Sequence, residues 1–389
     1  MDADRDRLGR ESHALRQALG VFPTRRAWLA AREGPGLVAR LERHLDLVRR
    51  FGPPAPPVAA PPPRDWLHVV QWNVLHGRRW QLVLEALQSE PALVGADLVA
   101  LEETDLGLAR SGNGDVAFDL ARALGLHAAW TPLFLELEAG YRTPPELAVL
   151  PQAESFFGLA LLSRYPIGEV RRVALESPED LLFDRERKAG KFAALVAQIL
   201  RPDTPFTMIV AHLDVHGSPS TRWRQMRQIL DVVPEGPAIL AGDLNTTTFA
   251  RGGWWRSART LAILACAPRS QLRRRLLSPH RPGPAPREPL FAALAASGFE
   301  IDPFNDGTES LDVHFDEVHE LDFLPPSVRR IVQAPLRAVE RRNAMRLDWI
   351  TARGFTAAPE RPPFSLPHCS RGPAAASDHA PVGCGLRFA

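Results

Sequence analysis

Residues 238–245 read AILAGDLN, a short apolar strand that runs directly into two polar side chains, Asp243 and Asn245. The same arrangement of an apolar strand beside polar residues recurs at several other places in the chain. The polar residues concerned are Asn73, Glu102, Glu103, His212, Asp348, Asp378 and His379. Polar groups at strand ends lie on the rim of a sheet, where loops build binding and catalytic sites. The alternation of such strands with helical segments predicts packed α/β layers.

Each of these polar positions also has an ordinary structural interpretation. An asparagine after a strand is a common turn residue, and the remaining short polar runs are typical of caps or surface positions. Their repeated occurrence behind apolar strands favours one shared site. Converging carboxylates repel one another unless a cation neutralises them. Because the candidate ligands are rich in oxygen and lack cysteine, the pattern predicts Mg²⁺ or Mn²⁺ rather than zinc.

Seven short motifs, taken in their order along the chain, resemble the endonuclease/exonuclease/phosphatase superfamily, which includes DNase I-like nucleases, AP endonucleases, sphingomyelinases and inositol-polyphosphate phosphatases. The motifs are QWNV (71–74), ALEETD (100–105), LLSRYPI (161–167), VAHLD (210–214), AGDLN (241–245), RLDWI (346–350) and SDHAP (377–381). The resemblance extends over residues 66–388 apart from much of 251–340. It implies an α/β fold in which two mixed β-sheets pack face to face with helices on both outer faces, a four-layered sandwich.

The resemblance also implies a metal site. Glu103 would be the principal ligand, in preference to Glu102, which stands where relatives often carry glutamine. Asn73 would support the metal or a phosphate oxygen, and Asp378 would lie near the metal. The implied cofactor is Mg²⁺ or Mn²⁺.

The catalytic roles carried over from the resemblance fall on five residues. Asp243 would orient and help deprotonate the attacking water, with Asn245 beside it. His379 would contact the scissile phosphate, and Asp348 would hold its ring and raise its affinity for a proton. His212 would be a second histidine on the phosphate side. For Asp348, a salt bridge to a nearby arginine is the structural alternative.

Other residues are weaker candidates for the site. Arg222, on a predicted helix, could bind a substrate phosphate with its guanidinium group, although a solvated helix face explains it equally well. His76 is expected to be a turn residue that could line the rim, and Lys188 is expected to belong to a solvated run of charges. Trp254 and Trp255 could stack on bases, but burial would explain them as well.

The chain divides into three predicted parts. Residues 1–52 form a helical N-terminal extension of two short helices, broken near Gly34-Pro35-Gly36, which either packs on the main domain or helps association. Residues 53–64 form a linker, because seven of the eleven residues at 53–63 are proline. Residues 65–389 form the catalytic domain, with an arginine-rich insertion near 251–340.

The composition excludes several classes of protein. Hydrophobic residues make up 45% of the 389 residues and charged residues 24%, which is ordinary for a globular protein and excludes wholesale disorder. No apolar run is long enough to predict a membrane span. The N-terminus lacks the apolar core of a secretory signal, and three widely spaced cysteines fit a reducing compartment, so we predict a cytoplasmic protein. The net charge of +2 does not by itself indicate binding to nucleic acid.

These observations predict a divalent-metal-dependent phosphoesterase that hydrolyses a phosphate ester by in-line attack of an activated water. A phosphodiesterase or nuclease is the leading prediction, with a nucleic acid as the leading candidate substrate. The alternatives are a phosphomonoesterase or inositol/lipid phosphatase of the same fold, and a catalytically inactive binding or scaffold protein. The sequence leaves the protein partners, the oligomeric state and the number of metal ions open.

Overall fold

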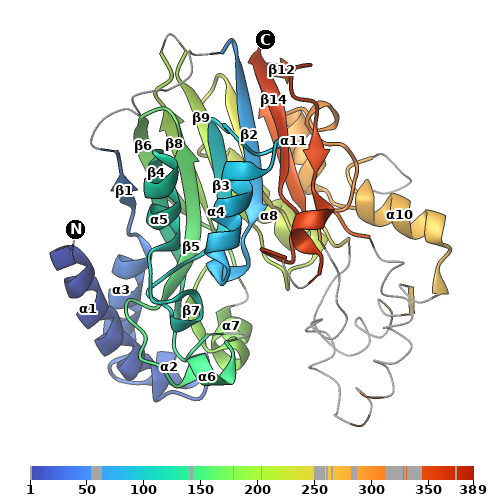
Figure 1. Cartoon of the computed structure of the whole chain (residues 1–389). Coiled ribbons are helices and arrows are strands. Elements are labelled where there is room, and N and C mark those ends of the chain that lie inside the picture. The colour runs from blue at the N-terminus through green and yellow to red at the C-terminus, as the bar shows by residue number, and fades with distance from the viewer. Residues whose placement is uncertain are drawn as a thin grey trace.

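The computed structural model of the chain, shown in Figure 1, describes most of the sequence. The described residues are 2–53, 64–140, 143–177, 179–202, 204–248, 259, 262, 263, 266–281, 287–311, 327, 330, 344–372 and 375–389. Most of the predicted linker at 53–64, the pair Trp254 and Trp255, and much of the predicted insertion at 251–340 lie outside them.

The N-terminal segment forms three helices and one strand. They are α1 (Asp2–Gly20), α2 (Arg25–Ala30), α3 (Gly34–Leu45) and β1 (Arg49–Phe51). The chain breaks between α2 and α3 directly before Gly34, close to the expected position, but the segment contains three helices where two were expected. Pro35 stands in the first turn of α3, where its missing N–H is not needed. The hydroxyl of Thr24 accepts a hydrogen bond from Ala27 N at 3.1 Å and caps α2.

This N-terminal segment packs on the main body of the protein. Figure 1 shows its helices beside β1 and α7 (Glu179–Glu186). Leu37 and Leu41 of α3 are buried, and the ring of Trp28 stacks on Phe183 of α7 at 5.3 Å. Strand β1 pairs with β4 (His127–Glu136) and so extends a sheet of the catalytic domain. The domain boundaries themselves stay a prediction.

The first sheet contains nine of the described strands, in the order β1-β4-β5-β3-β2-β14-β12, with β7 on β4 and β13 on β14. Strands β2 and β3 run parallel, and the other pairs are antiparallel. The bounds not yet given are β2 Trp66–Asn73, β3 Leu98–Leu106, β5 Phe156–Ser163, β7 Lys188–Gly190, β12 Phe355–Ala357, β13 Phe364–Ser365 and β14 Val382–Phe388.

The second sheet contains five of the described strands in the order β11-β10-β9-β8-β6. Strands β9 and β10 run parallel, and the other pairs are antiparallel. The strands are β6 Ile167–Ala174, β8 Ala193–Ile199, β9 Phe206–His212, β10 Ala238–Asp243 and β11 Asp348–Arg353. Both sheets are therefore mixed, as expected.

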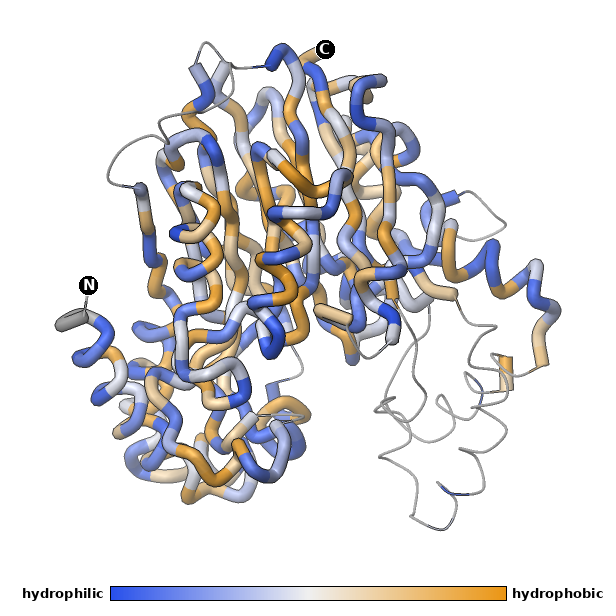
Figure 2. The backbone as a smooth tube through the Cα atoms, viewed as in Figure 1, coloured by the Kyte–Doolittle hydropathy of each residue, from blue (hydrophilic) through white to orange (hydrophobic). Residues whose placement is uncertain are grey.

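Two apolar clusters hold the layers together. Strand β2 contributes Leu67 and Val69 to the cluster between the sheets and Val70 and Trp72 to the cluster under the outer helices, since successive side chains point to opposite faces. The outer face of the first sheet is covered by α4 (Trp80–Ser89) and α5 (Val116–Leu124), and that of the second by α8 (Pro219–Leu230) and α11 (Leu290–Ala296). Figure 2 shows the apolar residues running along the strands. The expected four-layered sandwich is confirmed.

The remaining short elements lie in the connections. They are α6 Pro145–Ala148, α10 Arg269–Leu277, η1 Leu75–Gly77, η2 Ala109–Ser111, η3 Asp302–Phe304 and η7 Pro367–Ser370. Within the described part of the chain, no helix is both long enough and apolar enough to cross a bilayer.

Candidate active site

Strand pairing brings the polar strand ends together at one edge of the sandwich. Asn73 at the end of β2 stands opposite Glu102 on the parallel strand β3. In the second sheet, Asp243 at the end of β10 stands opposite His212 of β9 on one side and Asp348 of β11 on the other. Because parallel strands end at the same edge, residues far apart in the sequence become neighbours here.

A β-bulge in β3 turns two successive glutamates to different partners. The register of β3 against β5 shifts between Glu102 and Thr104, and Glu103 has φ +57°. A bulge of this kind re-aims a side chain, and a non-glycine residue at positive φ is strained unless its surroundings hold it. Asn73 Nδ2 donates to Glu103 Oε1 at 3.2 Å, and His76 Nε2 lies 3.4 Å from Glu103 Oε2.

Asp243 is held by the amide groups around it. Asn73 Nδ2 lies 3.1 Å from Asp243 Oδ2, and the backbone N–H of Asn245 donates to Oδ1 at 2.9 Å. The side chain of Asn245 turns away and donates to Leu213 O at 2.9 Å. Burial raises the pKa of Asp243 to about 7, which leaves this carboxylate poised to exchange a proton near neutral pH.

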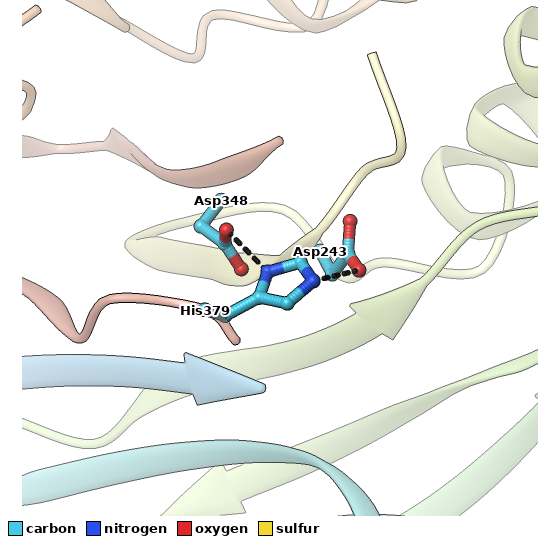
Figure 3. A group of neighbouring side chains, drawn as sticks. All are labelled: Asp243, Asp348 and His379. Atoms are coloured by element: carbon cyan, nitrogen blue, oxygen red, sulfur yellow. Dashed lines mark hydrogen bonds and ion pairs between the residues drawn. The ribbon is translucent and has the colours of Figure 1, made fainter. Parts of the chain in front are cut away.

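The ring of His379 lies between two carboxylates, as Figure 3 shows. His379 Nδ1 is hydrogen bonded to Asp348 Oδ2 at 2.8 Å, and Nε2 lies 3.8 Å from Asp243 Oδ2. Burial alone would lower the pKa of His379, but the charge and hydrogen bond of Asp348 and the charge of Asp243 raise it well above the ordinary value. Both carboxylates therefore favour the protonated form of the ring.

Asp348 has partners other than the nearby arginine considered from the sequence. Gln71 Nε2 donates to Asp348 Oδ1 at 2.8 Å and also to Glu102 Oε2 at 2.6 Å. Ser310 Oγ donates to Asp348 Oδ2 at 2.6 Å. Arg346, two residues earlier, bonds Asp306 at 2.7 Å instead.

The loop that carries His379 is fastened to the end of β2. Ser377 Oγ donates to Asn73 O at 2.7 Å and accepts from His379 N at 3.1 Å. The indole N–H of Trp72 donates to His379 O at 2.9 Å. These bonds place Asp378, which is partly buried, on the Glu103 side of the site, where its charge helps to raise the pKa of Glu103.

The residues on this side fit a divalent cation. Burial is the largest cause of the raised pKa of Glu103, and repulsion by Asp378 is the next. Two carboxylates held close together are stabilised by a bound cation, and the ligand atoms of Glu103 and Asp378 are oxygens, which Mg²⁺ and Mn²⁺ prefer. Asn73 turns its Nδ2 towards these acids, while its Oδ1 accepts from Leu75 N at 3.1 Å, so it supports Glu103 rather than offering an oxygen. Asp243, Asp348 and His379 also bring ligand atoms within 4.8 Å of one another, but hydrogen bonds already engage Asp348 with His379.

His212 lies beside the same carboxylate as His379. Its Nε2 is 3.6 Å from Asp243 Oδ2, and its ring meets Phe192 edge-on at 5.5 Å. Burial, followed by repulsion from protonated His379, lowers the pKa of His212 to about 3. The same surroundings thus shift the pKa values of the two histidines in opposite directions, and His212 is neutral at neutral pH.

Arg222 does not lie at the site, in contrast to the substrate-binding role considered for it. Its guanidinium is fully buried and donates to Glu288 Oε1 at 2.6 Å, to Glu288 Oε2 at 3.2 Å and to Gly217 O at 2.7 Å. Glu288 also accepts from Thr248 N at 2.7 Å. The side chain of Arg222 points from α8 into the protein interior. Its bonds to Glu288 join α8 to the segment that precedes α11.

Four residues near the site were missed or given less weight in the sequence analysis. They are Gln71, His76, Lys188 and Ser310. Lys188 is not part of a solvated charge run: its ammonium lies over the ring of Phe134 at 4.8 Å and pairs with Glu186 at 2.5 Å. The glutamine in QWNV was a possible signal, since it sits two residues before Asn73, but nothing in the sequence pairs Ser310 with Asp348.

With this geometry established, comparison with known proteins assigns the family. A model of the Endonuclease/Exonuclease/phosphatase family matches residues 70–379. The chain belongs to this family. Members of the endonuclease/exonuclease/phosphatase family are hydrolases that act on phosphate esters, and they generally depend on divalent metals.

Several solved structures are similar to the chain at low sequence identity. An endonuclease/exonuclease/phosphatase from Beutenbergia cavernae is 19% identical, with a TM-score of 0.50 over 84% of this chain and 72% of that one. The catalytic domain of human Nocturnin with bound sulfate is 15% identical, with a TM-score of 0.46 over 88% and 98%. An AP endonuclease from Archaeoglobus fulgidus is 14% identical, with a TM-score of 0.44 over 83% and 99%. No curated protein matches the chain.

Proposed function

We propose that this family member is a divalent-metal-dependent phosphodiesterase whose substrate is a nucleic acid. The observation that supports it most is the position of His379, whose ring lies between Asp348 and Asp243, two carboxylates that favour its protonated form, near Glu103 and Asp378. Hydrolysis of a phosphate ester needs a positioned water, a proton acceptor for it and a proton donor or hydrogen-bond donor for the phosphate.

Asp243 is the proposed acceptor of the water's proton. Its pKa near neutrality suits this role, because a base works best when it is mostly ionised at the working pH yet still holds a proton well. Asn73 Nδ2 and Asn245 N orient the two carboxylate oxygens, so that the carboxylate is fixed before the substrate binds. His212, neutral and 3.6 Å away, can accept or donate a hydrogen bond at the phosphate.

His379 is the proposed donor to the phosphate. Asp348 fixes which ring nitrogen faces it, since Nδ1–H donates to Asp348 Oδ2 and leaves Nε2–H directed into the site. A protonated Nε2 can donate to a phosphoryl oxygen or transfer a proton to the leaving oxygen. The negative charge of Asp348 stabilises the imidazolium form of His379 before substrate binds.

Glu103 and Asp378 are the proposed ligands of the divalent ion, and Asn73 supports them. When bound, such an ion neutralises charge on the phosphoryl oxygens and assists the leaving oxygen. Asn73 donates to both Glu103 and Asp243, and so holds the two carboxylates at the same edge of the sandwich.

The charge of the site favours a phosphodiester over a phosphomonoester. Five carboxylates gather here, those of Glu102, Glu103, Asp243, Asp348 and Asp378, and they outnumber the cations that act on them in the described part of the chain, His379, Lys188 and Arg346. A phosphomonoester carries nearly two negative charges at neutral pH and a phosphodiester carries one, so the diester meets less repulsion.

The three cysteines, Cys266, Cys369 and Cys384, are free thiols, in keeping with a reducing compartment. The cytoplasmic location stays a prediction, as do any protein partners.

A panel of substrates tests the proposal. Purified protein with Mg²⁺ is assayed on plasmid DNA, abasic DNA, RNA, bis(p-nitrophenyl) phosphate and p-nitrophenyl phosphate. The proposal expects cleavage of at least one nucleic acid and of the diester, with weaker binding of nucleic acid at higher salt. Turnover of p-nitrophenyl phosphate alone would establish the phosphatase alternative, and no turnover of any substrate would favour the inactive scaffold.

A further inference from the structure

The side chain of Ser310 is buried beside the Asp348–His379 pair, although it comes from a distant part of the chain. Its hydroxyl donates to Asp348 Oδ2 at 2.6 Å. Ser310 Oγ in turn accepts hydrogen bonds from the backbone N–H groups of Leu347 at 3.0 Å and Asp348 at 3.2 Å. Ser310 is fully shielded from solvent, so these partners are not replaced by water.

These three bonds fix the direction of the hydroxyl proton. A serine hydroxyl has one proton to donate and two lone pairs that accept. The N–H groups of Leu347 and Asp348 use the lone pairs, so the proton is directed at Asp348 Oδ2. That oxygen is the one that accepts from His379 Nδ1. Ser310 and His379 therefore donate to the same oxygen from two sides.

The backbone of Ser310 reaches the second member of the pair. Ser310 O accepts from Ala380 N at 2.7 Å, the residue directly after His379. Leu311 forms an antiparallel bridge with His379, and Ser310 N donates to Met345 O at 2.9 Å. One residue thus ties the start of β11, which carries Asp348, to the loop that carries His379.

We propose that Ser310 is a positioning residue that holds the Asp348 carboxylate in the orientation in which it binds the His379 ring. The inference rests on the proposed function, because it assigns Ser310 a part in the same reaction. Gln71 donates to the other oxygen of Asp348. Without the serine hydroxyl, only Gln71 and His379 would hold the carboxylate through side-chain hydrogen bonds, and the carboxylate could rotate more freely.

Ser365 provides a matched control for a purely structural role. It is also a serine whose side chain is hydrogen bonded close to β11: its hydroxyl donates to Asp306 Oδ1 at 2.8 Å and accepts from Arg346 Nη1 at 3.1 Å. The bonds of Ser365 do not involve Asp348 or His379. Its loss should weaken the local structure without disturbing the pair.

The test compares Ser310→Ala, Ser310→Cys, Ser310→Thr and Ser365→Ala on bis(p-nitrophenyl) phosphate with Mg²⁺. We expect Ser310→Ala to lower kcat about tenfold with little change in KM, the size expected when one oriented hydrogen bond in the transition state is lost. Ser310→Cys keeps the volume with a weaker donor and should fall between Ser310→Ala and wild type. Ser310→Thr keeps the hydroxyl and should restore most of kcat. If Ser310→Ala does not fold, Ser310→Cys decides in its place.

A second readout does not depend on activity. The Nδ1–H proton of His379, assigned by its disappearance in His379→Gln, is followed by NMR in each variant. The inference expects this resonance to move in Ser310→Ala or Ser310→Cys and to stay in place in Ser365→Ala. An unmoved resonance together with an unchanged kcat would overturn it. If wild type hydrolyses nothing, the proposed function fails, and the resonance alone decides whether Ser310 orients the pair.

Discussion

His379 Nδ1 lies 2.8 Å from Asp348 Oδ2, while the opposite nitrogen of the same ring lies 3.8 Å from Asp243 Oδ2. The ring therefore connects the loop before β14 in the first sheet with two strands of the second sheet. Both carboxylates favour the charged imidazolium and outweigh the cost of burying it. The pairing of β10 with β11 places Asp243 opposite Asp348, and the bond of Asp348 to His379 brings the proposed acid next to the proposed base.

Replacement of the proposed base or acid should abolish most of the activity. Asp243→Asn removes the proton acceptor and His379→Gln removes the donor, and each should lower turnover of a phosphodiester about a hundredfold or more. Steady-state kinetics on the substrate that the panel identifies measures this loss. The exposed residues Asp231 and His368 provide the matched controls Asp231→Asn and His368→Gln, which should keep wild-type rates. Wild-type turnover in both site variants would refute the assigned roles.

A buried histidine outside the site should make the protein sensitive to mild acid. Burial lowers the pKa of His68 on β2 to about 3, against about 6.5 in the unfolded chain. Between those values the unfolded state binds more protons, so the free energy of unfolding should fall as the pH falls from about 6.5 towards 3. Urea midpoints at pH 7 and pH 5 should differ less in His68→Gln than in wild type, whereas His368→Gln should behave as wild type. An equal pH effect in His68→Gln would contradict this.

The buried pair of Arg222 and Glu288 should matter for stability rather than for substrate binding. Arg222→Met leaves the Glu288 carboxylate buried and unpaired, which should cost about 3–5 kcal/mol of unfolding free energy. The double variant Arg222→Met/Glu288→Leu should recover much of that loss. An exposed pair, Arg122 with Asp119, gives the control Arg122→Met, expected to cost about 0.5 kcal/mol or less. Denaturant unfolding measures the stability of all three variants. A raised KM in an Arg222→Met protein of normal stability would instead support a role for Arg222 in substrate binding.

The N-terminal helices should stabilise the catalytic domain. Trp28 is buried and stacks on Phe183, so Trp28→Ala should cost about 3–5 kcal/mol, whereas the partly exposed neighbour Leu29 should tolerate alanine. Removal of residues 1–53 also unpairs β1 from β4 and should lower the melting temperature further. Thermal unfolding of the three variants checks this, and a truncated protein as stable as the full chain would show that the extension is separable.

The strand ends could be predicted from the sequence because each combines an apolar run with a polar residue. The two parallel pairs, β2 with β3 and β9 with β10, then bring Asn73, Glu103, His212 and Asp243 to one edge. Strand β4 escaped prediction because Pro132 interrupts it, and the structure accommodates that proline at a register shift between Pro132 and Phe134. Strand β6 was not predicted either, because it lies at the edge of its sheet and carries charged residues.

The contacts that could not be predicted join residues far apart in the chain. Arg222 meets Glu288 across 66 positions, and Ser310 meets Asp348 across 38. Periodicity and motif spacing report only on local structure, so they do not reveal which charged residue of a helix is buried against a distant carboxylate. The bulge that aims Glu103 likewise depends on the partner strand β5 and not on the residues around it.

Dependence on a divalent cation tests the central claim most directly. Turnover of bis(p-nitrophenyl) phosphate is measured for wild type and Glu103→Gln in Mg²⁺, in excess EDTA, and after Mg²⁺ is restored. We expect EDTA to abolish wild-type turnover, Mg²⁺ to restore it, and Glu103→Gln to stay nearly inactive throughout. Undiminished wild-type turnover in EDTA, or a Glu103→Gln protein as active as wild type, would contradict it.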